Sequence, residues 1–228
     1  MMTTYKAQQI LMEAAMQDII KLCADNLRTC SKDHGIKLKA SHAHELVAMF
    51  FGYNSKAALL ADTLYPISNL PQATIIMFAP VKLIDERHEG LKNLPSDLPD
   101  IDTLREWFYT PLLAETWFAS KFKPDYKELA TFLADQYLRI NQMEKLYHSH
   151  TEDDLQVVRY DDCIHLTLQR LYRTPTEDMI LRGNIHEAII TTTILFKRVA
   201  ANIGYAAPDV TAKLERAKKI HRQLVIPH

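Results

Sequence analysis

The chain has 228 residues, of which 47% are hydrophobic and 24% charged, and its 27 basic and 28 acidic side chains leave a net charge of −1. This length and composition suit one large or two small globular domains and exclude a disordered or fibrous chain. A nearly neutral chain has no overall attraction for nucleic acid or anionic lipid, so such binding would need a local patch.

Three cysteines are present, and none forms a closely spaced pair of the kind that holds zinc. We interpret them as free thiols in a reducing compartment. The N-terminus carries no apolar run after a basic start, and no stretch of about 20 apolar residues occurs. The sequence therefore predicts a cytoplasmic protein that does not bind membranes.

The first two thirds of the chain are expected to be mainly helical. Apolar residues recur at spacings of three and four over 4–33, which predicts one long amphipathic helix that Gly35 ends. The segment 41–62 predicts two short helices joined by a corner, because Gly52 stands at the position of a left-handed C-terminal cap. Tyr53 is the apolar partner of this cap. The next helix can be capped by Asn54 or Ser55.

Further along the chain, 74–79 predicts a brief strand and 81–91 a short helix. Asp102 is expected to cap an aromatic helix over 103–120, which Pro111 should kink or split because proline lacks the amide proton. Pro124 and Asp125 then open a helix that runs to about residue 148.

In the last third the apolar period shifts from about 3.6 towards 2, which favours antiparallel strands over 155–160, 163–173 and 187–198. Asp161 and Asp162 form a possible tight turn. The rival interpretation makes 161–172 and 184–203 helices. Pro208 predicts a terminal helix that reaches about Leu224.

The predicted fold class is therefore α+β, with a mainly helical N-terminal two thirds and a small antiparallel sheet and closing helix in the C-terminal third. The rival helical interpretation of the last third would make the chain all-α. A proline-rich connection suggests a division into 1–92 and 101–228, although one domain is the alternative.

The run 36–62 resembles the small helical module known as the glyoxalase-related, or glyoxalase-like C-terminal, domain of bacterial proteins. The matching positions are Ser41, His42, Glu45, Ala48, Gly52, Tyr53, Ala58 and Leu59, whereas Lys56 stands where the family often has tryptophan. The resemblance implies a bacterial protein, sometimes carried on mobile elements, with a helical module of unassigned activity. It transfers no metal ligand and no catalytic base.

The helix corner at 45–62 also has the form of a DNA-reading helix-turn-helix unit, in which alanine and glycine let two helices approach closely. A basic cluster near the C-terminus could supply phosphate contacts. The candidate nucleic-acid residues are Ser55, Lys56, Lys213, Arg216, Lys218, Lys219 and Arg222. The second helix offers no arginine, asparagine or glutamine to read a base, so packing is the preferred interpretation.

Candidates for metal chemistry are His148 and His150, which could approach one ion in a loop and so support a metal-dependent hydrolase or nuclease. His42 and Glu45, three apart, could share a helix face. His42 and His44 cannot chelate one ion together on a helix, because residues two apart point to different sides. An exposed acidic turn and helix capping explain these groups as well.

Arg159 and His165 have the spacing of the arginine-histidine motif of some helical toxin nucleases, and Cys163 with His165 suggests a thiol nucleophile. Chance spacing explains the first pair, and two residues two apart on a strand need not touch. The chain contains no Gly-x-Ser-x-Gly elbow, phosphate loop or dinucleotide fingerprint, so we expect no cofactor of those kinds.

The aromatic segment provides the candidate interface, which comprises Trp107, Tyr109, Trp117 and Phe118. A core helix is the alternative interpretation. The sequence thus favours a non-catalytic cytoplasmic interaction protein that forms a homo-oligomer, with DNA binding second and a metal-dependent hydrolase third.

Overall fold

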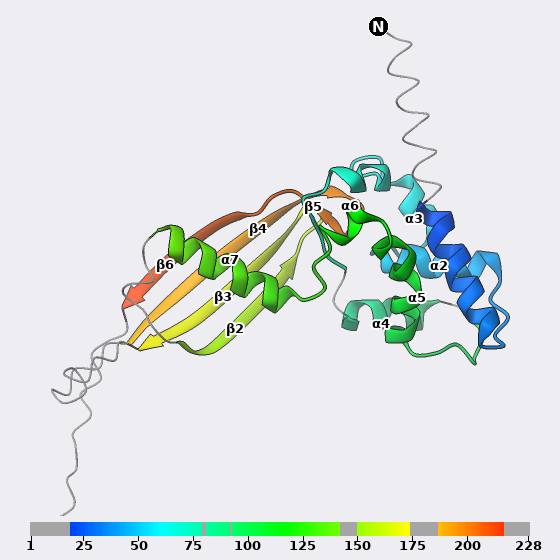
Figure 1. The fold of residues 1–228 in the computed structure, drawn as a ribbon, viewed down its shortest axis with the longest axis horizontal. Coiled ribbons are helices and arrows are strands. Elements are labelled where there is room, and N and C mark those ends of the chain that lie inside the picture. The colour runs from blue at the N-terminus through cyan, green and yellow to red at the C-terminus, as the bar shows by residue number, and fades with distance from the viewer. Residues whose placement is uncertain (1–18, 79–80, 92, 142–149, 174–186, 217–228) are drawn as a thin grey trace, which may run out of the picture. The chain divides into compact units, whose positions relative to one another are not determined.

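The computed structural model describes residues 19–78, 81–91, 93–141, 150–173 and 187–216, which form helices and antiparallel strands (Figure 1). The expected α+β class is confirmed. The chain divides into two compact units, which are Met1–Pro124 with Arg198–Ala207 and Asp125–Lys197 with Pro208–His228. The division therefore falls after Pro124, whereas a boundary between 92 and 101 was expected. The aromatic segment belongs to the first unit.

The first unit contains helices and very short strands. Residues 19–33 are helical, and the part of the expected helix before residue 19 lies outside the described residues. The next elements are α2 (Ala40–Phe50), α3 (Lys56–Ala61), the 3-10 helix η1 (Ile67–Gln72), β1 (Ile75–Ile76), α4 (Val81–Gly90), α5 (Ile101–Leu113), α6 (Thr116–Ala119) and β5 (Gly204–Tyr205). β1 pairs antiparallel with β5, so the strand expected at 74–79 is only two residues long.

The corner between α2 and α3 has the expected capping geometry. Gly52 has a φ of 88°, and the Tyr53 amide donates a hydrogen bond to the Ala48 carbonyl over 2.9 Å. This Schellman arrangement satisfies carbonyl groups at the end of α2. Of the two candidate caps of α3, Ser55 is the one used, since its hydroxyl accepts a hydrogen bond from the Ala58 amide over 3.1 Å.

α5 continues through Pro111 and ends at Leu113, so the expected break of the aromatic helix comes after the proline. A proline inside a helix leaves the carbonyl four residues earlier without its usual amide donor. Here that carbonyl belongs to Trp107, and the side-chain amide of Asn26 donates to it over 2.6 Å. The helix at 19–33 thus supplies the donor that Pro111 lacks.

The second unit is built around a four-stranded antiparallel sheet, with α7 against one face (Figure 1). Its elements are α7 (Tyr126–Ile140), β2 (His150–Arg159), β3 (Cys163–Arg173), β4 (Glu187–Ala200) and β6 (Asp209–Arg216), with the strands in the order β2-β3-β4-β6. The last three residues of β4 belong to the first unit. α7 was expected to reach residue 148, but 142–149 lie outside the described residues.

The three strands expected at 155–160, 163–173 and 187–198 are confirmed, and the rival helices are wrong over 161–172 and 187–203, whereas 184–186 lie outside the described residues. Asp161 and Asp162 form the turn between β2 and β3, where the Tyr160 amide donates to the Cys163 carbonyl over 2.9 Å. The β-branched residues of this region favour a strand because they lose side-chain freedom in a helix.

The caps of two helices differ in how well the sequence predicted them. Asp100, and not Asp102, caps α5, because its carboxylate accepts a hydrogen bond from the Thr103 amide over 2.8 Å. Asp125 caps α7 as expected, by accepting hydrogen bonds from the amides of the first turn. α5 thus begins slightly earlier than its apolar pattern suggested.

The expected closing helix is wrong over Asp209–Arg216, which is strand β6. Val210, Ala212 and Leu214 pair with β4 on the face that α7 covers, and the residues between them point to the other side. This period of two is that of a strand. The remainder of the expected helix, 217–224, lies outside the described residues. In the part of the chain that the structure describes, no helix has the length and apolar character needed to cross a membrane.

Candidate functional site

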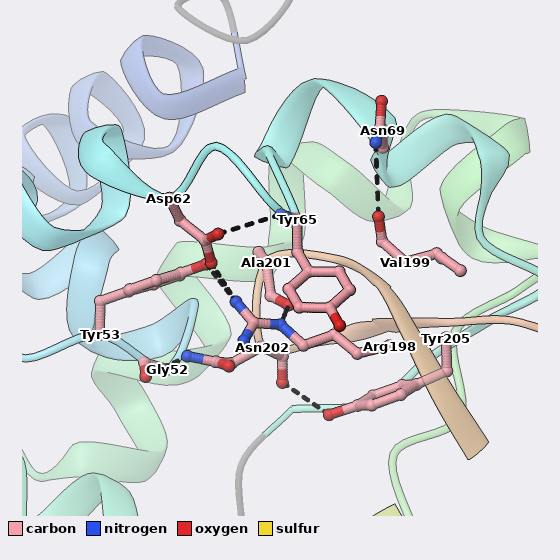
Figure 2. A network of polar contacts seen from close by, with 10 residues as sticks. All are labelled: Gly52, Tyr53, Asp62, Tyr65, Asn69, Arg198, Val199, Ala201, Asn202 and Tyr205. Atoms are coloured by element: carbon pink, nitrogen blue, oxygen red, sulfur yellow. Dashed lines mark hydrogen bonds and ion pairs between the residues drawn. The ribbon is translucent and has the colours of Figure 1, made fainter. Parts of the chain in front are cut away.

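Arg198 lies at the centre of a polar network in the first unit (Figure 2). Its guanidinium donates hydrogen bonds to the carboxylate of Asp62 and, over 2.8 Å, to the hydroxyl of Tyr53. The Tyr53 hydroxyl donates in turn to Asp62 over 2.6 Å, and the Tyr65 amide donates to the other carboxylate oxygen over 3.0 Å. The guanidinium carbon of Arg198 lies over the Tyr65 ring, 4.4 Å from the centroid of the ring. Both charged groups are therefore held by several partners.

The same network fastens the returning segment after β4 to the glycine corner. Arg198 also donates to the Ala201 carbonyl, and the side-chain amide of Asn202 donates to the Gly52 carbonyl over 2.7 Å. Ala201 has a φ of 44°, a left-handed conformation that costs an alanine about 1 kcal/mol. A Cβ atom on Gly52 would lie 2.5 Å from the Cβ of Asn202. The corner therefore serves to pack against residues 201 and 202.

The charges in this network leave no group ready for proton transfer near neutral pH. Burial, and then the hydrogen bond to Asp62, raise the pKa of Tyr53. Burial alone would raise the pKa of Asp62, but the hydrogen bonds from Tyr53 and the Tyr65 amide, together with the charge of Arg198, lower it. Tyr53 stays protonated and Asp62 stays ionised. The arrangement is that of a structural clamp.

A second buried arginine lies between α7 and the sheet of the second unit. The side chain of Arg170 is only 1% exposed, and its guanidinium pairs with Asp153 over 3.0 Å and with Asp135 of α7. The Tyr172 hydroxyl lies 3.5 Å from the same guanidinium, and burial raises the pKa of this tyrosine. A buried charge is tolerated only when it is paired. Arg170 therefore ties α7 to β2 and β3.

The face of this sheet opposite α7 is built from alternate residues, and we call it the open face. It comprises the even-numbered residues 154–158 of β2 and the odd-numbered residues 163–171 of β3, 189–197 of β4 and 209–215 of β6. The apolar side chains there are partly exposed, whereas those on the α7 face of β3 and β4 are buried. Val158 is 46% exposed. Antiparallel sheets often leave one face to solvent, but that face is usually strongly polar.

The open face is instead rich in threonine and aliphatic residues, and its charges are mostly paired. Lys197 lies 3.5 Å from Asp209, and Lys213 lies 2.7 Å from Glu215. In each pair both partners point to the open face. The surface is therefore close to neutral and contains a sizeable apolar fraction, which is typical of a protein interface.

The expected aromatic interface lies mainly inside the first unit. Trp107 is 9% exposed and Phe118 is fully buried, so both are core residues and unavailable to a partner. Tyr109 and Trp117 are partly buried and pack against the same core. The stacking of aromatic rings within one unit explains this hydrophobic segment.

Among the described residues, the candidate nucleic-acid residues are divided between the two units. Ser55 is engaged as the cap of α3, and the Lys56 amide donates to the Glu45 carboxylate over 2.9 Å. Lys213, paired with Glu215, and Arg216 lie on β6 in the other unit. The proposed basic helix is therefore a strand at these two positions. The other three candidates, Lys218, Lys219 and Arg222, lie outside the described residues.

The metal candidates are not assembled in the part of the chain that the structure describes. His148 lies outside it, and His150 begins β2. The ring Nδ1 of His44 donates a hydrogen bond to the Ala40 carbonyl over 2.7 Å, within its own helix. Among the described residues, no group of three or more histidine, cysteine, aspartate and glutamate side chains is placed to hold a metal ion.

The sheet separates the two residues of the nuclease candidate, and the surroundings of Cys163 disfavour its thiol as a nucleophile. Arg159 points to the α7 side, where it donates to the Tyr126 hydroxyl over 3.0 Å, whereas His165 lies on the open face. Partial burial and the neighbouring Asp162 raise the pKa of the Cys163 thiol, which disfavours the reactive thiolate.

Sequence reasoning missed both arginine clamps. For Arg170 a signal was present, since it follows Ile164, Leu166 and Leu168 in the same alternating phase and so had to be buried and paired. Arg198 had no comparable local signal. Comparison of the chain with known protein families, with curated proteins and with solved structures finds no match.

Proposed function

We propose that this protein is a non-catalytic interaction protein that associates with itself. The observation that carries the proposal is the open face, a sheet surface of threonine and aliphatic side chains whose charges are mostly paired. Such a surface loses little hydration free energy of charged groups when it is covered, and it gains from the burial of its apolar atoms.

The two polar clusters support the absence of catalysis in this proposal. In each cluster the arginine and the carboxylates are bound to one another, and Tyr53 and Tyr172 have raised pKa values. A catalytic acid or base needs a pKa near the working pH and access to a substrate. The clusters hold elements together, which is what a scaffold for an interaction surface requires.

The proposed location is the cytoplasm of a bacterium. Cys23, Cys30 and Cys163 are all free thiols, which supports a reducing compartment. The resemblance of 36–62 to the glyoxalase-related module supports a bacterial source. DNA binding is the second proposal and has weaker support, because the Ser55 hydroxyl is engaged as a helix cap and Lys213 is paired with Glu215.

Sedimentation velocity of the full chain over a wide concentration range tests self-association. We expect a species of twice the chain mass of 26.3 kDa that dissociates on dilution. A single species of 26.3 kDa at every concentration would contradict the proposal. A gel shift with duplex DNA at low salt tests the second proposal, which predicts retardation that weakens steeply as salt rises.

A further inference from the structure

We infer that the open face is the self-association surface and that a second copy of the chain stacks on it, sheet against sheet, around a two-fold axis that runs along the strands between β3 and β4. This inference rests on the proposed self-association and adds its surface and symmetry. α7 lies along the opposite face (Figure 1), so the open face is not covered by this helix.

Strand pairing orders the open face into rows that cross the sheet. The middle row is Gln156, Thr167, Thr193 and Thr211. The next row is Asp154, Gln169, Thr191 and Lys213. Beyond it, Leu171 pairs with Ile189, and on the other side of the middle row His165 pairs with Leu195. Because the rows are regular, the symmetry of a stacked pair determines which side chains meet.

A two-fold axis along the strands exchanges β3 with β4 and β2 with β6. Each row then faces the same row of the other copy in reverse order, so Thr167 meets Thr193 and Leu171 meets Ile189. A two-fold axis across the strands would instead place Ile189 against Lys197, an apolar group against a charge. In these two rows the first symmetry matches apolar with apolar residues and small with small ones, while in the rows on the other side of the middle row it places Asp209 opposite Val158 and Lys197 opposite Cys163.

The first symmetry also gives a partner to a charge that lacks one in the described part of its own copy, whereas the second would pair Lys213 with Asp209, and each of these already has a partner in its own copy. Asp154 has no ion pair among the described residues, and it stands at the β2 end of the row whose β6 end is Lys213. Exchange of β2 with β6 brings Asp154 of each copy opposite Lys213 of the other, so the pair contains this contact twice. Lys213 can keep Glu215 as its neighbour, and Lys197 can keep Asp209. Complementary charges at the edge of an interface fix its register.

The area of the open face is sufficient for a dimer. With strands about 4.8 Å apart and rows about 6.8 Å apart, the 17 positions of the open face cover about 550 Å² in each copy and about 1,100 Å² in the pair. Specific interfaces begin at about 1,000 Å². Aligned sheets pack about 10 Å apart, a distance that threonine, leucine and isoleucine side chains can fill from both sides.

Charge reversal at the two matched positions tests the inference by sedimentation equilibrium. We expect Asp154→Lys and Lys213→Glu each to weaken the dimer at least about tenfold, because each places like charges opposite one another twice. A mixture of the two single variants should form a heterodimer, since both contacts are then between opposite charges. The double variant should likewise regain the wild-type association.

Lys127→Glu, on the exposed surface of α7, is the matched control and should leave the association unchanged. Recovery in the mixture also shows that neither variant is merely misfolded. If the wild type is a dimer but the single variants associate normally, or the mixture shows no preference for the heterodimer, the inferred surface and symmetry are wrong while self-association stands. A monomeric wild type overturns both.

Discussion

Gly52 and Gly35 end their helices in the same way but have different surroundings. Both have positive φ values, 88° and 77°, and both stand in a Schellman turn. A Cβ atom on Gly35 would meet no atom within 4 Å, whereas on Gly52 it would collide with Asn202. We expect Gly35→Ala to lower the free energy of unfolding by about 1 kcal/mol and Gly52→Ala by about 3 kcal/mol, since overpacking adds to backbone strain.

Tryptophan fluorescence during urea unfolding measures both variants, because Trp107 and Trp117, the two tryptophans of the chain, lie in the first unit. The difference between the two glycines isolates the contact with Asn202. Equal losses of stability would mean that the corner does not pack against residues 201 and 202.

The carboxylate of Asp62 gives the first unit a specific dependence on pH. Its pKa is lower in the folded state than the ordinary value of 3.8, so its stabilising effect is present above that value and is lost as the pH falls through the folded pKa. Asp62→Asn should lower the free energy of unfolding by about 2 to 4 kcal/mol at pH 7, because it leaves Arg198 poorly paired.

Urea unfolding followed by tryptophan fluorescence at pH 7 and in acid compares this variant with the wild type. The two proteins should become more alike in stability as the pH falls below the folded pKa of Asp62. Asp97→Asn, at an exposed position of the same unit, is the control and should follow the wild type throughout. A constant difference between Asp62→Asn and the wild type at every pH would contradict the role assigned to the carboxylate.

At the scale of elements, α7 is held to its sheet by apolar contacts and by Arg170. Leu138 of α7 packs with Tyr172 and Ile190, and Arg170 adds the ion pairs with Asp135 and Asp153. We expect Arg170→Met to destabilise the second unit by about 3 kcal/mol, because it leaves Asp153 largely buried without its cation. Asp135→Asn should cost at most about 1 kcal/mol, since this partner is 58% exposed.

Hydrogen exchange of the β3 and β4 amides measures this effect, because the second unit contains no tryptophan. Protection should fall strongly in Arg170→Met and little in Asp135→Asn. Similar protection in both variants would mean that apolar packing alone holds the helix.

The sequence predicted elements best where a single period persists. The alternation in β3 and the β-branched run in β4 identified both strands, and the Gly52 corner was recognisable from its cap residues. Prediction failed at 209–216, where Pro208 suggested a helix start although Val210, Ala212 and Leu214 alternate as in a strand. In that segment the helix-start signal of Pro208 was given more weight than the period of two. The pairing with β4 makes the segment a strand.

At the scale of the whole molecule, the division into units could not be predicted from local patterns. The segment 198–207 returns to the first unit, where Asn202 meets Gly52 across 150 positions of sequence. Such a contact depends on shape and on one side-chain amide, and neither leaves a periodic signal. The open face, by contrast, follows from the alternation in β3 and from its pairing with β4, because residues that alternate with a buried set must share the other face.

The two units should respond differently to protein concentration if the open face is the dimer surface. Association stabilises only the unit that the partner contacts in its folded state. The midpoint of thermal unfolding of the second unit should therefore rise with protein concentration. Hydrogen exchange of the sheet amides, or circular dichroism of the sheet, follows the thermal unfolding of the second unit. Tryptophan fluorescence follows the first unit. We expect the fluorescence midpoint to stay constant while the sheet midpoint increases, and in Asp154→Lys neither should move. A fluorescence midpoint that rises with the sheet midpoint would mean that the two units unfold together.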